Sequence, residues 1–194
     1  MPAKKSHAMF LGSFLLLASS PLMATPSASM LANTCAGCHG TGGNSVGPAS
    51  PTIAGKSAEY IQSVMEAYKS GERYSTIMGR IANGYTDEEI TLMAEYFAGM
   101  PFESNAPKQE FDAAKVEAGA KVYKDNCSKC HDENGSLPDD DSGILAGQWL
   151  PYLQYTMADY RAGRSDMTKK MKKKVEKLDD AQIESVLQFF ASQK

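Results

Sequence analysis

The sequence predicts an all-α protein built from two tandem copies of one small domain. The chain aligns with itself at an offset of 92 residues, which brings the segment Cys35–His39 onto Cys127–His131. Apolar residues recur with helical spacing, and no alternating run of apolar and polar residues is long enough for a strand. A length of 194 residues leaves room for two domains of roughly 100 residues each.

The first segment is predicted to direct export. Lys4 and Lys5 precede an apolar run over residues 9–18, which is too short to span a bilayer. The triplet that ends at Ala24 supplies a cleavage site with a small residue. We therefore expect a signal peptide over residues 1–24 and a periplasmic protein that does not span the membrane; an uncleaved anchor is the alternative.

The repeat then extends along the rest of the chain. The same offset carries residues 53–55 onto 145–147 and residues 60–62 onto 152–154, and beyond Gly163 it becomes 93. Two prolines and a glycine interrupt the helical pattern over residues 99–107. This interruption predicts a first domain over residues 25–104 and a second over residues 105–194.

Each copy contains the same series of elements. A short helix precedes each cysteine cluster, over residues 29–34 and 114–126, and a loop rich in glycine, proline and serine follows the cluster. A helix with Tyr60 and Tyr68 on one face comes next. The last helix opens with a capping box, formed by Thr86 and Glu89 in the first copy and by Asp179 and Gln182 in the second.

The repeated pattern Cys-x-x-Cys-His is the attachment signature of c-type haem. Two thiols at this spacing can add to the two vinyl groups of one porphyrin, while the adjacent imidazole reaches the iron. A zinc site, a redox dithiol and structural disulfides are the alternatives, and each explains the histidine or the spacing less well. We expect two covalently bound haem c groups, attached through Cys35, Cys38, Cys127 and Cys130, with His39 and His131 as axial ligands.

Methionine is the expected sixth ligand of each iron, because no other histidine remains after Ala24. In the first copy Met78 stands in an irregular segment between two helices and is preferred. Met65 and Met93 fit core packing, and Met100 lies beside Pro101 in the linker. In the second copy Met171 aligns with Met78 at the offset of 93, whereas the offset of 92 gives Lys170. We prefer Met171, and Met167 is the alternative.

The remaining features give no sign of a catalytic site. Both histidines of the mature chain are assigned to iron, so no free imidazole is left for acid–base chemistry, and we expect no enzymatic activity from this chain itself. A net charge of −3 gives no reason to expect nucleic acid binding. The lysine-rich run 169–174 is either a solvated face or a docking surface for an acidic partner, and Trp149 is expected to pack on haem or between domains.

The chain resembles the dihaem cytochrome subunit of flavocytochrome c sulfide dehydrogenase. The resemblance covers the mature chain and is carried by residues 35–40, 43–51, 75–85 and 144–155. It implies two cytochrome c domains, each wrapped around one haem, and an FAD-containing flavoprotein subunit that oxidises sulfide. Electrons would pass through this dihaem subunit to a soluble cytochrome c. A free-standing dihaem carrier that feeds a terminal oxidase is the alternative.

The family pattern also suggests how the first ligand histidine is oriented. Pro48 stands where a proline carbonyl often holds the second ring nitrogen of the ligand histidine. The equivalent position in the second copy is Asp140, so the partner of His131 is left open.

Overall fold

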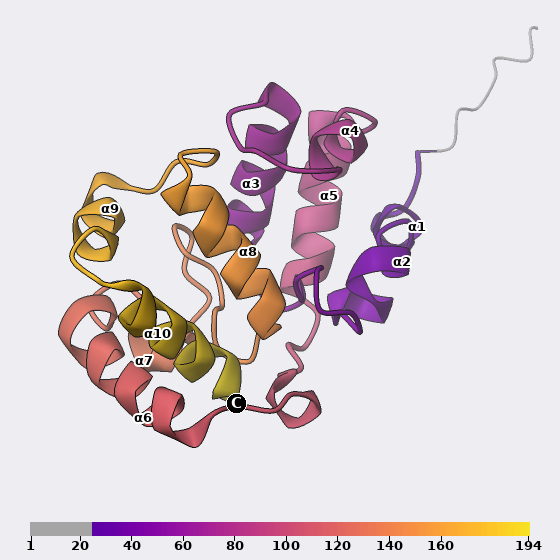
Figure 1. The fold of residues 1–194 in the computed structure, drawn as a ribbon. Helices are drawn as coiled ribbons and strands as arrows, with labels where there is room; N and C mark the ends of the chain where they lie inside the picture. Colours follow the sequence, from indigo (N-terminus) through magenta and orange to yellow (C-terminus); the bar gives the residue numbers. More distant parts are fainter. Residues whose placement is uncertain (1–24) are drawn as a thin grey trace, which may run out of the picture.

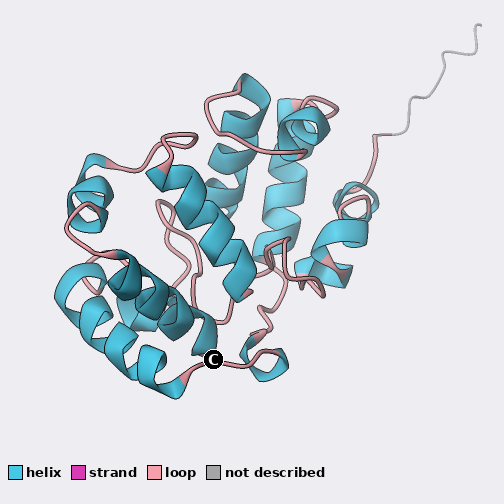
Figure 2. Ribbon diagram, viewed as in Figure 1, coloured by secondary structure: helices cyan, strands magenta, loops and turns pink. Residues whose placement is uncertain are grey.

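The computed structural model describes residues 25–194, so the predicted signal peptide lies outside the described residues. Regular structure in the described part is helical throughout, and no strand occurs there, as the sequence predicts (Figure 2). None of the described helices is long and apolar enough to cross a membrane.

The elements fall into two groups that follow the repeat. The first group lies at the upper right of Figure 1 and the second at the lower left. The first group consists of α1 (Ala28–Asn33), α2 (Ala36–His39), η1 (Thr41–Gly43), α3 (Ala58–Ser70), α4 (Met78–Ala82) and α5 (Asp87–Ala98). The linker holds η2 (Ala106–Lys108), and the second group consists of α6 (Ala113–Val122), η3 (Tyr123–Cys127), α7 (Asp132–Gly135), α8 (Leu150–Arg161), α9 (Lys169–Val175) and α10 (Asp180–Ser192).

In the first domain, α5 packs against both α1 and α3. Its buried face carries Ile90, Met93 and Phe97, each no more than 3% exposed. Met65 packs against the same cluster, so the expectation that Met65 and Met93 are core residues is confirmed. The start of α5 is fixed by the predicted capping box, because Thr86 accepts from the Glu89 amide and Glu89 accepts from the Thr86 amide.

In the second domain, α10 crosses α6 at close range. Gly119 lies at this crossing, and a Cβ atom there would collide with the backbone carbonyl of Ser185. Glycine therefore lets the two helices approach closely enough for Val122 and Phe189 to share one apolar cluster. The capping box of Asp179 and Gln182 at the start of α10 is confirmed as well.

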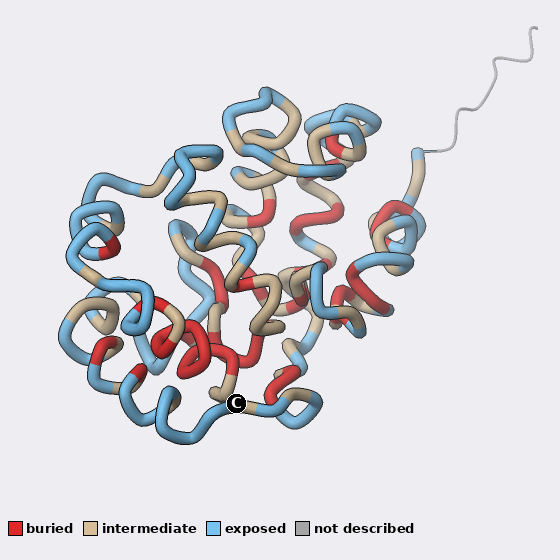
Figure 3. The backbone as a smooth tube through the Cα atoms, viewed as in Figure 1, coloured by how far each residue is buried: buried red, intermediate tan, exposed pale blue. Residues whose placement is uncertain are grey.

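The two domains meet through loops that the repeat relates to each other, and buried residues gather where these loops cross (Figure 3). Gln148 is fully buried; its Oε1 accepts from the Thr52 amide at 3.0 Å, and its Nε2 donates to the Thr52 carbonyl at 2.8 Å. In the opposite direction, the Lys56 Nζ donates to the Ile144 carbonyl at 3.0 Å. Lys56 and Gln148 are repeat equivalents, as are Thr52 and Ile144, so each domain reaches into the same loop of the other.

The linker also takes part in this interface. The Asn105 amide donates to the Gly147 carbonyl at 2.8 Å, and its side chain donates to the Thr52 hydroxyl at 3.0 Å. Asn105 therefore bonds to both domains, and the boundary between residues 104 and 105 stays a prediction. Trp149 donates through Nε1 to the Ser45 carbonyl at 3.2 Å, which joins the two domains directly.

Candidate functional site

The first cysteine cluster is folded into a single helical turn. Cys35 is the N-cap of α2, and Cys38 and His39 lie within that helix. The His39 amide donates to the Cys35 carbonyl at 2.9 Å, which holds this turn together. His39 is only 9% exposed, whereas Cys38 lies at the surface. The turn thus presents two thiols and one imidazole from five consecutive residues.

The imidazole of His39 is oriented by a loop carbonyl. Its Nδ1 lies 2.8 Å from the Pro51 carbonyl oxygen, so with Nδ1 as the donor the other ring nitrogen, Nε2, is the one available to a metal. The expectation that Pro48 plays this role is wrong. The carbonyl that reaches His39 belongs to Pro51, three residues further along the same loop. Burial lowers the pKa of His39, and the bond to Pro51 partly opposes that shift.

The second cluster differs from the first in its local backbone. Cys127 ends η3, a π-helical segment that continues α6. His131 is less buried than His39, and no hydrogen bond to its ring occurs among the described residues. The repeat equivalent of Pro51 is Gly143, whose own amide donates to the Asp139 carbonyl at 2.9 Å. Burial lowers the pKa of His131, while Asp139 and Asp132 act against that shift.

The four cysteines are free, and the first cysteine of each cluster lies against an apolar core. All four are unpaired by disulfides, and Cys35 and Cys127 each pack against the core of their own domain. Burial raises the pKa of Cys35, and it raises the pKa of Cys127 to about 11 despite the opposing effect of Lys174. At Cys35 and Cys127, burial therefore disfavours the thiolate form.

Metal binding by side chains alone has no support in the described part of the chain. No group of three or more His, Cys, Asp and Glu residues among residues 25–194 is placed to hold a metal ion. A buried, oriented imidazole beside two free thiols does fit a covalently attached haem, for which the protein supplies only one nitrogen ligand and one further axial ligand.

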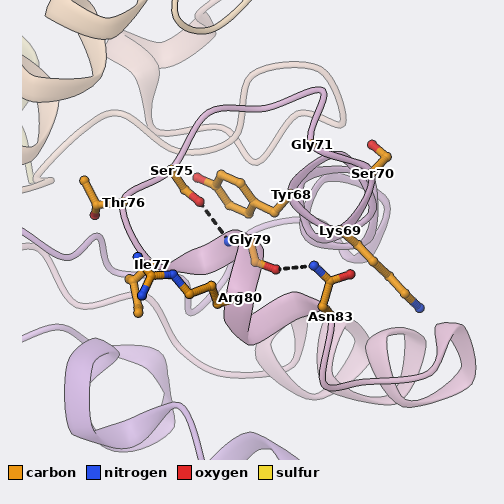
Figure 4. Close-up of a pocket in the computed structure, with 10 residues that line it drawn as sticks. All are labelled: Tyr68, Lys69, Ser70, Gly71, Ser75, Thr76, Ile77, Gly79, Arg80 and Asn83. Carbon is orange, nitrogen blue, oxygen red and sulfur yellow. Dashed lines mark hydrogen bonds between the residues drawn. The ribbon is translucent and has the colours of Figure 1, made fainter.

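Met78 lies at the point where a helix starts. The sequence places it in an irregular segment, but in the structure it is the first residue of α4, with Ile77 as the N-cap. The Ser75 hydroxyl accepts from the Gly79 amide at 2.8 Å, which satisfies a backbone donor that the first turn leaves free. A pocket of about 330 Å³ lies at this turn. Ile77 and Gly79 line it, whereas Met78 does not (Figure 4). The role of Met78 as a ligand stays a prediction.

The two methionines considered for the second haem lie close together in the chain. Met171 belongs to α9, and Met167 precedes that helix. Both are partly buried and pack against the core of the second domain. The lysines of α9 are exposed, so the amphipathic helix turns Met171 and Val175 inward. Because both methionines pack against the same core, their packing does not distinguish them, and the preference for Met171 over Met167 stays a prediction.

The residues that join the domains were not identified as functional from the sequence. Lys56 and Gln148 belong to no recognisable motif. Only their equivalence at the repeat offset could have pointed to them in the sequence. Trp149 packs between the domains, which is one of the two placements expected for it.

Comparison with known proteins shows that both halves of the chain match the same family. The sequence model of cytochrome c matches residues 26–101 and again residues 116–194. The cytochrome subunit of sulfide dehydrogenase from Chlorobaculum tepidum is 55% identical over 71 residues, which cover 37% of this chain and 64% of that protein. The thiosulfate dehydrogenase electron acceptor of Stutzerimonas stutzeri is 39% identical over 69 residues, which cover 34% of this chain and 32% of that protein.

Both of these matches span less than two thirds of the relative's length. The fold as a whole is similar to that of reduced recombinant cytochrome c4 from Pseudomonas stutzeri, with a TM-score of 0.75 and 23% identity. That superposition covers 88% of this chain and 100% of the other, so the arrangement of both domains is shared.

Proposed function

The chain belongs to the cytochrome c family, and from its two domains with two covalently bound haem c groups we propose that it is the electron-transfer subunit of a sulfide-oxidising complex. In this role it accepts electrons from an FAD-containing flavoprotein subunit in the periplasm and passes them to a soluble cytochrome c. It carries no catalytic site of its own. The observation that carries the proposal is the 55% identity to the sulfide dehydrogenase subunit.

The segments that carry the resemblance lie at the domain interface. Two segments distinguish the resemblance to the sulfide dehydrogenase subunit, namely residues 43–51 and residues 144–155. In the structure these segments bond to each other, through Trp149 and Ser45 at 3.2 Å. Gln148 reaches the residue that follows the first segment, Thr52. The distinguishing residues thus fix how the two domains sit together.

The haem groups supply a reversible one-electron change at each iron. In our proposal Cys35 and Cys38 hold the first haem and Cys127 and Cys130 hold the second, while His39 and His131 bind the irons. Met78 and Met171 would be the second protein ligands of the two irons, and a methionine ligand raises the reduction potential relative to a second imidazole. The apolar clusters against which Cys35 and Cys127 pack would cover one side of each haem group.

Isolation from the native host tests the donor. We expect the haem-loaded protein to co-purify with a flavoprotein in fixed ratio, and sulfide to reduce both haems only when that flavoprotein is present. Reduction by thiosulfate in place of sulfide, or recovery of the dihaem chain alone, would overturn the assignment.

The alternative function is a free-standing dihaem carrier that delivers electrons to a terminal oxidase. It is favoured by the match to cytochrome c4, which pairs the whole of that chain with this one. A carrier would purify as a single chain, and membranes containing an oxidase would oxidise its reduced form without a flavoprotein. These two readouts separate the functions.

A further inference from the structure

The hydroxyl group of Tyr123 holds the backbone on both sides of the second cluster's end. It donates to the His131 carbonyl at 2.9 Å and accepts from the Asn134 amide, also at 2.9 Å. One phenolic oxygen therefore uses its donor and an acceptor site within residues 131–134. The backbone carbonyl of Tyr123 accepts from the Ser128 amide at 2.9 Å, so the same residue also holds the turn between the two cysteines.

The ring of Tyr123 is fixed by the aromatic side chains of α10. It stacks on Phe189 with ring centres 5.0 Å apart and meets Phe190 edge-on at 5.6 Å. Phe190 in turn lies edge-on to the imidazole of His131, with ring centres 5.8 Å apart. The hydroxyl is thus presented by a packed ring, and this ring shares a neighbour with the imidazole.

The backbone that this hydroxyl holds has an unusual conformation. Glu133 and Asn134 have φ angles of 47° and 60°, and no other residue besides glycine has a positive φ among residues 25–194. The repeat equivalent of Asn134 is Gly42, whose φ is 63°. Glycine adopts this left-handed region freely, whereas asparagine and glutamate do so at a cost in free energy. The second domain therefore needs an interaction that keeps residues 133 and 134 in place, and the bond from the Asn134 amide supplies one.

The first domain holds its ligand histidine by a different route. The repeat equivalent of Tyr123 is Leu31, which has no hydroxyl group to offer. There the Pro51 carbonyl lies 2.8 Å from the His39 ring. The His131 ring has no such partner among residues 25–194. The first histidine is thus oriented through its ring and the second through its backbone.

We propose that Tyr123 is the positioning residue of the second haem site. Its hydroxyl fixes the backbone at His131, and this backbone fixes the plane in which the imidazole meets the iron. Groups that orient a ligand imidazole also tune the metal it binds. The inference rests on His131 as an iron ligand and does not depend on the proposed sulfide donor.

The variant Tyr123→Phe in the haem-loaded protein tests this role, because it keeps the ring and removes the oxygen. The Asn134 amide is expected to exchange with solvent about tenfold faster, since its acceptor is lost. An imidazole turned from its plane donates less charge to the iron, which favours the reduced form. We expect the equilibrium of the second haem to shift about threefold toward that form while the first haem stays unchanged. A tenfold change corresponds to 59 mV for one electron, so threefold is about 30 mV.

Proton NMR of the oxidised protein gives a readout that a merely structural role would not move. The spread of the methyl signals of a ferric haem depends on the plane of the ligand imidazole. In Tyr123→Phe we therefore expect the methyl signals of the second haem to move and those of the first to stay in place. Tyr155→Phe is the matched control, because Tyr155 is 61% exposed on α8 and its hydroxyl bonds to nothing among residues 25–194.

The double variant Tyr123→Phe with Asn134→Gly separates the two hydrogen bonds. Glycine gives the second domain the residue that the first has at Gly42, so the loop can keep its backbone without the hydroxyl. We expect part of the shift in potential to be restored and part to persist, because the His131 carbonyl still lacks its donor. The double variant also provides the measurement if Tyr123→Phe alone does not keep the second haem.

Two results would overturn the proposal. One is a potential and a methyl pattern at the second haem that change no more than in Tyr155→Phe, even if the Asn134 amide exchanges faster. The other is an equal change at both haems, which would show a general loosening of the protein and not a loss of orientation at His131.

Discussion

Gln148 of the second domain and Thr52 of the first are joined by two hydrogen bonds between one side chain and one peptide unit. The Thr52 amide donates to the Gln148 Oε1 at 3.0 Å, and the Gln148 Nε2 donates to the Thr52 carbonyl at 2.8 Å. Both residues are fully buried. Breaking this pair leaves two backbone groups without partners inside the interface.

We therefore expect Gln148→Met to destabilise the protein by about 2–4 kcal/mol, because an unsatisfied buried donor or acceptor costs about 1–3 kcal/mol. Denaturant unfolding of the haem-loaded protein, followed by the haem absorption of each domain, measures the loss. Gln62→Met on α3 is the control, since the Gln62 side chain bonds only to Glu66 near the surface. Equal stability of the two variants would show that this pair does not hold the domains together.

The iron ligands can be tested with leucine, which has nearly the volume of methionine but no sulfur. We expect Met78→Leu to remove the far-red methionine-to-iron absorption of one haem and to lower its reduction potential. Met171→Leu is expected to do the same for the other haem, with Met167→Leu as its control. If Met167→Leu abolishes the band and Met171→Leu keeps it, the assignment in the second domain must be exchanged.

The sequence predicts the helices and their caps well because these depend on local chemistry. The capping boxes at Thr86 and Asp179 follow from residues three positions apart, and both occur as predicted. The partner of His39 could not be predicted, because the choice between Pro48 and Pro51 depends on how a loop rich in glycine and proline folds back. Lys56 was missed for a similar reason, since a lysine is normally solvent-exposed and only the packing of two domains buries it.

His39 and His131, the proposed iron ligands, are expected to differ in the exchange of their ring protons. The His39 Nδ1 lies 2.8 Å from the Pro51 carbonyl in a buried position, whereas the His131 ring has no such partner among residues 25–194. Iron binding at Nε2 leaves the proton on Nδ1, and a carbonyl acceptor fixes that tautomer. In proton NMR of the reduced protein we expect the His39 ring N–H to exchange with solvent more slowly than that of His131. Equal exchange rates would mean that the carbonyl does not hold the ring.

Lys56 also makes a prediction about stability and pH. Burial, with a smaller effect of Arg73, lowers the pKa of Lys56 to about 7 in the protein chain alone, against about 10.4 for an exposed lysine. With that value the unfolded chain would bind up to one more proton than the folded chain between about pH 7 and 10. The free energy of unfolding would therefore rise with pH by up to about 1.4 kcal/mol per pH unit. Tyr60 and Arg73 are the other ionisable groups facing Lys56, and neither loses its proton near pH 7.

We therefore expect the difference in unfolding free energy between wild type and Lys56→Gln to be constant below pH 7 and to grow in favour of wild type as the pH rises from 7 to 8. Denaturant titrations at closely spaced pH values measure this difference, with Lys121→Gln as the control for loss of a surface charge. A difference that stays constant from pH 6 to 8 would show that Lys56 keeps the pKa of an exposed lysine at the domain interface.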